Sequence, residues 1–294
     1  MYWFLLSLMC AFFSASQAAY GKKLAMRGQH MLIAWVVFFF STPFFGAYLI
    51  FKKVPFPEIS PRFLLLLLAV VLLNILANTL YFKALKVGQL SRDLPLLSLS
   101  PIFMMLTTYL MVGQKITPLG AVAIVVMVIG SFVLQRENGS SIKVMALALW
   151  RVAGTRLMLM VALIWSISAN MDKLCINEVG SLWYPFLFSL SFGIVFLPLL
   201  LYKKVPIWSE TRIYWKQFLM LGLINALAIL PQMLAVEVAP HVAYVVSIKR
   251  GGYLLFGIIF GAVFFKERNL GWRIFGAAWI IVGLVILSLN AISG

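Results

Sequence analysis

Long runs of apolar residues make up most of the chain, and short polar segments separate them. A helix that crosses the hydrocarbon of a bilayer, which is about 30 Å thick, needs about 20 such residues. Ten runs of this kind are predicted as helices, at residues 2–20, 31–51, 63–83, 93–111, 117–135, 156–175, 183–202, 216–237, 243–265 and 270–290. The chain is therefore predicted to be an all-α membrane protein with ten transmembrane helices.

Short sequence patterns recur about 150 residues apart, in the same order along the chain. Phe51–Pro55 (FKKVP) matches Tyr202–Pro206 (YKKVP), and Phe13–Ser16 is similar to Trp165–Ser168. The ordered matches predict a duplicated unit of five helices. Because five is odd, the second copy enters the membrane from the opposite face and forms an inverted repeat, which is typical of secondary transporters.

The repeat predicts two domains and a linker. Residues 1–135 form the first five-helix repeat, residues 155–294 form the second, and residues 136–154 join them. In an inverted repeat the substrate site lies near the midplane of the membrane, between the two halves.

Composition agrees with a membrane protein and excludes other classes. Of the 294 residues 63% are hydrophobic and 11% are charged, against about 45–50% and about 25% in soluble proteins. A soluble, disordered or fibrous protein is excluded. The net charge of +16 arises in short segments between the apolar runs, which is the distribution that orients membrane proteins. We therefore predict no nucleic-acid partner.

Residues for catalysis, cofactors and metals are scarce. The sequence has no HExxH, GxSxG or Walker A motif, which are signatures of metalloproteases, serine hydrolases and nucleotide-driven proteins. Cys10 and Cys175 lie in apolar runs, and His30 and His241 are too few and too far apart for a metal site. We predict no catalytic residue, no metal and no cofactor, and that the protein is not an enzyme.

Family-like patterns lie in both halves of the chain. They are Tyr81–Gly88 at the end of the third run, Pro95–Pro101 in the fourth, and Phe264–Arg268 followed by Gly276 and Gly283. With these patterns the chain resembles the EamA branch of the drug/metabolite transporter superfamily over nearly its whole length. The resemblance implies two five-helix bundles around a central cavity lined by runs 1, 3, 4, 6, 8 and 9. Where this family usually has Glu before the fifth run, the chain has Gln114.

Two charged pairs lie inside apolar runs, where each charge costs about 2.5–3.5 kcal/mol unless it is paired or faces water. Asp172 and Lys173 lie in the sixth run, and Lys249 and Arg250 lie in the ninth. These runs are antiparallel, so all four residues are expected at one depth. We predict that Lys249 and Arg250 bind an anion, as a Lys-Arg pair does in the similar triose-phosphate and nucleotide-sugar branch. The alternative is that Asp172 or Glu237 neutralises one cation.

Polar residues share helix faces on several of the same runs. The predicted cavity-lining residues among them are Asn74, Asn78, Asn225, Gln232, Gln17, Asn170 and Tyr253. Hydrogen bonds between helices, worth about 0.6 kcal/mol on average, are the alternative interpretation of each residue alone, and packing is the alternative for Tyr253.

The orientation has two interpretations. Most Lys and Arg residues follow odd-numbered runs, so the positive-inside rule predicts both termini outside, whereas the family resemblance implies both termini inside. In either orientation we predict a multi-pass protein of the cell (inner) membrane.

These observations predict a secondary transporter that moves a small organic metabolite, anionic or phosphorylated, by alternating access. The partners would be that substrate, the lipid bilayer, and a coupling proton or counter-substrate. The alternative is a non-transporting scaffold or receptor whose intramembrane charges are structural, and a passive channel is a third hypothesis.

Overall fold

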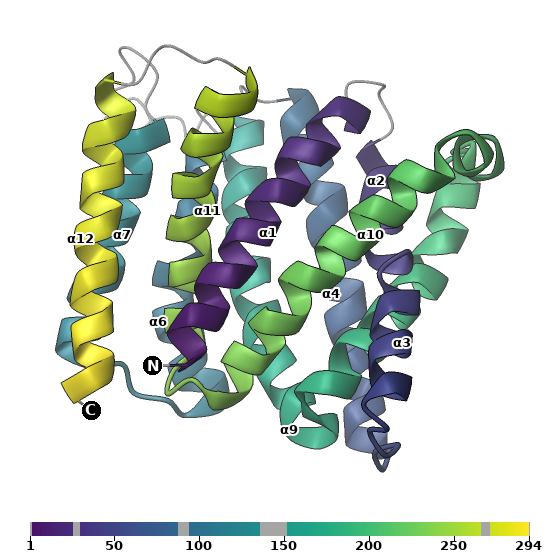
Figure 1. Cartoon of the computed structure of the whole chain (residues 1–294), viewed down its shortest axis with the longest axis horizontal. Helices are drawn as coiled ribbons and strands as arrows, with labels where there is room; N and C mark the ends of the chain where they lie inside the picture. Colours follow the sequence, from purple (N-terminus) through teal and green to yellow (C-terminus); the bar gives the residue numbers. More distant parts are fainter. Residues whose placement is uncertain (1, 26–29, 88–93, 136–151, 266–270, 294) are drawn as a thin grey trace.

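The computed structural model describes residues 2–25, 30–87, 94–135, 152–265 and 271–293, and these parts are helical without any strand (Figure 1). The elements are α1 (Tyr2–Ala25), α2 (His30–Phe39), α3 (Thr42–Phe51), α4 (Pro61–Val87), η1 (Leu94–Leu99), α6 (Ser100–Val112), α7 (Pro118–Gln135), α9 (Ala153–Tyr202), α10 (Ile207–Val238), α11 (Val242–Phe265) and α12 (Gly271–Ser293). The prediction of an all-α protein is confirmed for these residues. Most of the predicted linker, at 136–151, lies outside them.

Seven described helices are long and apolar enough to cross a membrane, and two shorter apolar helices, Leu96–Val112 and Pro118–Leu134, accompany them. The 50-residue α9 would measure about 75 Å if straight, more than twice the thickness of the hydrocarbon. It bends at Gly180, whose φ of 79° and ψ of 160° are not helical. The predicted runs 156–175 and 183–202 lie on the two sides of this bend.

Two predicted runs are interrupted at proline. The second run divides into α2 and α3, and Pro43 lies in the first turn of α3. Proline has no N–H and its ring clashes with the carbonyl four residues earlier, so a continuous helix is disfavoured. The fourth run likewise begins as the 3-10 helix η1, and α6 begins at Ser100 with Pro101 in its first turn.

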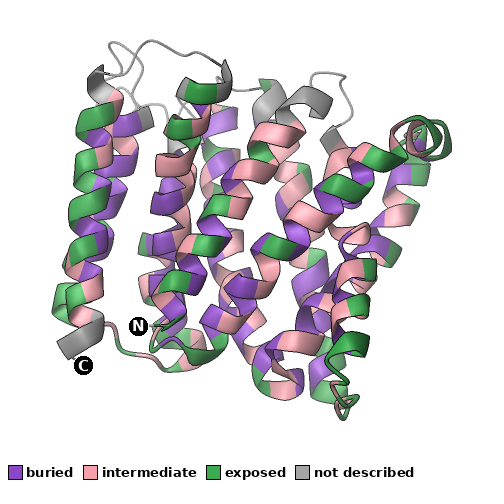
Figure 2. Cartoon of the chain, viewed as in Figure 1, coloured by how far each residue is buried: buried purple, intermediate pink, exposed green. Residues whose placement is uncertain are grey.

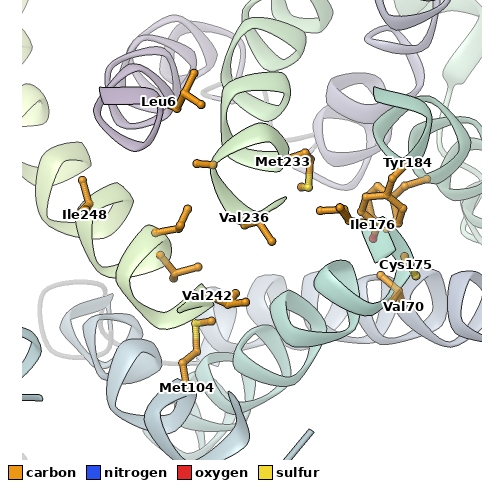
Figure 3. Packing of buried hydrophobic residues seen from close by; sticks show 14 of the residues in the cluster. Leu6, Val70, Met104, Cys175, Ile176, Tyr184, Met233, Val236, Val242 and Ile248 are labelled. Atoms are coloured by element: carbon orange, nitrogen blue, oxygen red, sulfur yellow. The ribbon is translucent and has the colours of Figure 1, made fainter. Parts of the chain in front are cut away.

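The helices pack in pairs that join the two halves of the sequence. α7 packs along α12, α4 along α9, and α1 along α10 and α11 (Figure 1). Buried side chains of α1, α2, α4, α6, α7, α9, α10, α11 and α12 form one hydrophobic core. Figure 3 shows part of this core, with Met233 of α10 beside Ile176 and Tyr184 of α9.

The outer faces of the bundle are exposed and rich in large apolar residues (Figure 2). Leu65, Leu110 and Val263 are 70%, 68% and 65% exposed. A soluble monomer rarely exposes apolar patches of this extent, so these faces suit contact with lipid.

Glycines allow α7 and α12 to approach closely. A Cβ atom on Gly276 would lie 2.4 Å from the backbone nitrogen of Leu134, and one on Gly283 would lie 2.9 Å from the carbonyl oxygen of Ala123. Small residues at such contacts increase the van der Waals packing that drives helix association in lipid.

We predict that Gly276→Ala lowers the free energy of unfolding by about 1–3 kcal/mol, because the added methyl group overpacks a backbone contact. Gly257→Ala is the matched control, since a Cβ there meets nothing within 4 Å and alanine favours helix. Thermal unfolding of both purified variants tests this expectation. A Gly276→Ala protein as stable as the control would contradict it.

Candidate functional site

A cavity of about 270 Å³ lies between α2, α4, α9, α10 and α11. Its lining combines three charged side chains with amides, a hydroxyl and aromatic rings. The charged and polar lining residues are Asp172, Lys249, Arg250, Asn74, Asn78, Ser168 and Gln232, and the aromatic ones are Phe38, Trp165, Tyr184 and Phe188. Helices from both halves of the sequence therefore build one polar cavity.

The Lys249 ammonium group lies at the wall of this cavity with a neutral partner. Its Nζ donates a hydrogen bond of 2.6 Å to Oε1 of Gln232, and the same oxygen accepts a 3.6 Å hydrogen bond from Sγ of Cys10. No carboxylate in the described parts of the chain forms a salt bridge with Lys249. One N–H donor of the ammonium group is thus bonded to an amide oxygen, and no direct ion pair with a described carboxylate neutralises its charge.

Arg250 stacks on an aromatic ring. Its guanidinium carbon lies 5.2 Å from the centre of the Trp165 ring, and Trp165 in turn packs against Tyr81 at 5.9 Å between ring centres. A cation over an aromatic ring at this distance is attracted to the negative face of the ring, which leaves the N–H donors of the guanidinium group available to an acceptor. Arg250 also forms no salt bridge with a described carboxylate.

Asp172 forms a hydrogen bond with a tyrosine. The hydroxyl of Tyr184, which is buried, donates it to Oδ1 of Asp172 across the bend at Gly180. Glu237 accepts a 2.6 Å hydrogen bond from Oγ of Ser181. Neither carboxylate forms a direct salt bridge within the described residues, but Asp172 interacts electrostatically with Lys249 and Glu237 with Lys173.

Lys173 points away from the cavity and holds the end of a helix. Its Nζ donates hydrogen bonds of 2.9 and 2.8 Å to the carbonyl oxygens of Val236 and Glu237, in the last turn of α10. The final carbonyls of a helix lack partners within it and carry a partial negative charge. Lys173 therefore caps α10, while the preceding residue, Asp172, lines the cavity.

Two other predicted residues lie at contacts between helices. Asn170 is fully buried and exchanges hydrogen bonds with Thr107 and Thr108 of α6, at 2.9 and 2.7 Å. Asn225 donates a 3.2 Å hydrogen bond to Oγ of Ser41, at the break between α2 and α3. For these two residues the described contacts match the alternative interpretation, a hydrogen bond between helices.

Four predicted amides and one tyrosine complete the set. Asn74, Asn78 and Gln232 line the cavity, and Asn74 also donates a 2.7 Å hydrogen bond to Oγ of Ser168. Gln17 and Tyr253 are half-buried and do not line it.

The aromatic residues that line the cavity do not stand out in the sequence. Phe38, Tyr184 and Phe188 lie in apolar runs where aromatic residues are common, so periodicity does not distinguish them. Tyr184 could have been identified from the sequence, because a buried tyrosine hydroxyl usually needs a hydrogen-bond partner. Asp172, on the other side of the bend at Gly180, is such a partner.

The helical bundle and its apolar outer faces define a multi-pass integral membrane protein, and a polar cavity lies between helices of its two halves. The sequence model of the EamA-like transporter family matches residues 1–136 and, a second time, residues 152–289. The chain belongs to this family, whose members are membrane transporters of the drug/metabolite transporter superfamily.

Solved structures share the fold. One crystal structure of a protein is similar over 97% of this chain and 99% of its own, with a TM-score of 0.75 and 16% sequence identity. At that identity the likeness concerns the fold alone. No curated protein matches the chain in sequence.

We predict that Lys173→Met lowers the free energy of unfolding by about 1–3 kcal/mol, because it leaves two carbonyls of α10 without their charged donor. Lys52→Met, at an exposed lysine, is the control and should leave stability unchanged. Denaturant unfolding in detergent measures both. Equal stability of the two variants would show that the α10 cap contributes nothing.

Proposed function

We propose that the protein is a secondary transporter of a small organic anion, which it carries across the membrane by alternating access. The observation that carries this proposal is the placement of Lys249 and Arg250 at the cavity wall without a carboxylate ion pair among the described residues. A charge kept away from bulk water is costly unless an opposite charge or an aqueous cavity compensates it. The carboxylate or phosphate of a substrate would supply that charge.

The balance of charges in the cavity sets what it accepts. With Asp172 ionised, the two cations leave one net positive charge, which a monoanion neutralises. With Asp172 protonated, a dianion such as a phosphate monoester neutralises both. Protonation of Asp172, whose ionised form accepts the hydrogen bond of the Tyr184 hydroxyl, would therefore couple proton movement to transport. Asn74, Asn78 and Gln232 would orient the rest of the substrate.

Alternating access would use the two repeats, residues 1–135 and 155–294, as inverted halves with ten membrane crossings. In this assignment α2 with α3 forms one crossing, η1 with α6 forms another, and α9 forms two. The double match of the family model and the bend at Gly180 support it. The crossings would lie in the cell (inner) membrane, with the Lys- and Arg-rich segments in the cytoplasm.

Hydrogen bonds join the two halves at one end of the bundle, and alternating access would have to break them. The backbone nitrogen of Val242 donates a 3.2 Å hydrogen bond to Oε1 of Gln114. Oγ1 of Thr117 lies 3.1 Å from the Tyr244 hydroxyl and donates a 2.9 Å hydrogen bond to Oδ1 of Asn290. Gln114, the position where the family usually has Glu, is thus one of the residues that link the halves.

We predict that Arg250→Ala abolishes transport while folding and expression persist. For the wild-type protein, an anionic metabolite at 100 times its dissociation constant should stabilise the fold by about 2.7 kcal/mol. This stabilisation should be absent in Arg250→Ala and present in the control Arg156→Ala, because Arg156 is exposed on α9. Thermal unfolding across a panel of small metabolites, followed by uptake into vesicles, measures both effects. Wild-type uptake by Arg250→Ala would overturn the site.

The scaffold alternative predicts a different pattern for Lys249 and Asp172. If both charges are purely structural, Lys249→Met with Asp172→Asn should be tolerated better than either change alone, with no uptake lost. If Lys249 binds substrate, the double variant should be as deficient in uptake as Lys249→Met. Uptake and thermal stability of the three variants separate the two functions.

A further inference from the structure

Exposed cations and aromatic rings gather where α9 turns into α10, away from the cavity. We call this group the basic corner, and it consists of Tyr202, Lys203, Lys204, Trp208, Arg212, Trp215 and Lys216. The aromatic rings are large and uncovered, since Tyr202, Trp208 and Trp215 are 79%, 83% and 51% exposed. Such exposed rings need an environment other than the protein core.

The first part of α10 lies across the axis of the bundle. Tyr214 has non-helical angles (φ −113°, ψ 19°), so the direction of the helix changes there. In Figure 1 the beginning of α10 is seen end on at the upper right, while most other helices run from top to bottom. Ile207 and Phe218, 5% and 3% exposed, anchor the segment on both sides of the bend. This orientation suits a helix lying in the plane of the membrane surface.

The charge of the basic corner is positive and is not compensated by ion pairs. Lys203, Lys204, Arg212 and Lys216 are exposed, and none forms a salt bridge with a carboxylate in the described residues. Lys203 and Lys216 lie 5.7 and 5.6 Å from the ring centres of Tyr202 and Trp215. The carboxylate of this segment, Glu210, is two residues from Trp208 and so about 200° around the helix from it.

We propose that the basic corner binds the headgroups of anionic phospholipids. Tryptophan and tyrosine favour the level of the headgroups, and cations near an anionic membrane surface are attracted to it. Trp208 and Arg212 are four residues apart in the part of α10 before Tyr214, which places them on one side of the helix, and Trp215 follows directly after the bend. A phosphate group at this level therefore meets cations between aromatic rings that already lie in the interface.

The first repeat contains a matched corner that is not followed directly by a helix. Lys52 and Lys53 follow α3 as Lys203 and Lys204 follow α9, and the second lysine of each pair has a left-handed backbone, with φ of 49° and 54°. No helix follows Lys53 until α4 begins at Pro61. The two corners lie at opposite ends of the bundle (Figure 1). The Lys52 and Lys53 pair is therefore a natural control with the same turn and the same charge.

The test measures lipid retention by the full-length protein in detergent. Native mass spectrometry with added phosphatidylglycerol or phosphatidylcholine gives the apparent dissociation constant of each lipid. We expect the wild-type protein to prefer phosphatidylglycerol. Lys203→Gln with Lys204→Gln should weaken that lipid about 25-fold, since each cation near an anionic surface is worth about a factor of five. Arg212→Gln should add a similar factor, and phosphatidylcholine binding should not change.

Three controls decide the result. Lys52→Gln with Lys53→Gln should leave phosphatidylglycerol binding unchanged, and Lys203→Arg with Lys204→Arg should retain it, which shows that charge and not folding is responsible. Soluble glycerol phosphate should fail to compete at lipid concentrations. An unchanged affinity in the Lys203 and Lys204 variant, an equal loss in the Lys52 and Lys53 variant, or equal competition by glycerol phosphate would each overturn the proposal. Transport plays no part in the readout, so its outcome is independent of the proposed function.

Discussion

A bilayer offers no water to a charged or polar group inside it, so each such group must find a partner within the protein or in a water-filled cavity. This constraint organises the whole bundle. Lys173 meets it by capping the last carbonyls of α10, and Asn170 by bonding to two threonines of α6. Lys249 and Arg250 meet it only in part, through an amide and an aromatic ring. Lys249 and Arg250 can therefore still bind an anion, and this distinguishes the cavity that they line from the other polar contacts of the bundle.

The same constraint explains why irregular backbone occurs where it does. The break between α2 and α3 is bonded by Asn225 through Ser41, and the bend at Gly180 lies beside the Ser181–Glu237 and Tyr184–Asp172 hydrogen bonds. Backbone that leaves the helix inside a membrane is tolerated when the protein surrounds it, and the break between α2 and α3 meets that condition. The bend at Gly180 lies instead between the two proposed crossings of α9, next to the hydrogen bond of Tyr184 with the cavity-lining Asp172.

Helix association needs a different force, because lipid tails are as apolar as leucine. Close approach at Gly276 and Gly283 supplies it for α7 and α12, at the edge of the bundle. The cavity lies elsewhere, between α2, α4, α9, α10 and α11. An equally close approach occurs there at Gly222 of α10, where a Cβ atom would lie 2.3 Å from the carbonyl oxygen of Phe40. Small residues thus allow tight packing both at the edge of the bundle and among the helices that carry the charged residues.

Apolar runs and a repeated pattern such as FKKVP and YKKVP are present in the chain itself, so the sequence predicted an all-α membrane protein with two repeats. It did not predict the breaks between α2 and α3 and between η1 and α6. Depth along antiparallel helices also predicted that Asp172, Lys249 and Arg250 lie at one level. Which way each side chain points is decided by packing between helices. Adjacent residues on a helix differ by about 100°, so Asp172 reaches the cavity while Lys173 caps α10. Packing between helices also bonds Asn170 to threonines of α6 and places Trp165 and Tyr184 in the cavity wall. The roles of these three residues depend on neighbours that are distant in sequence.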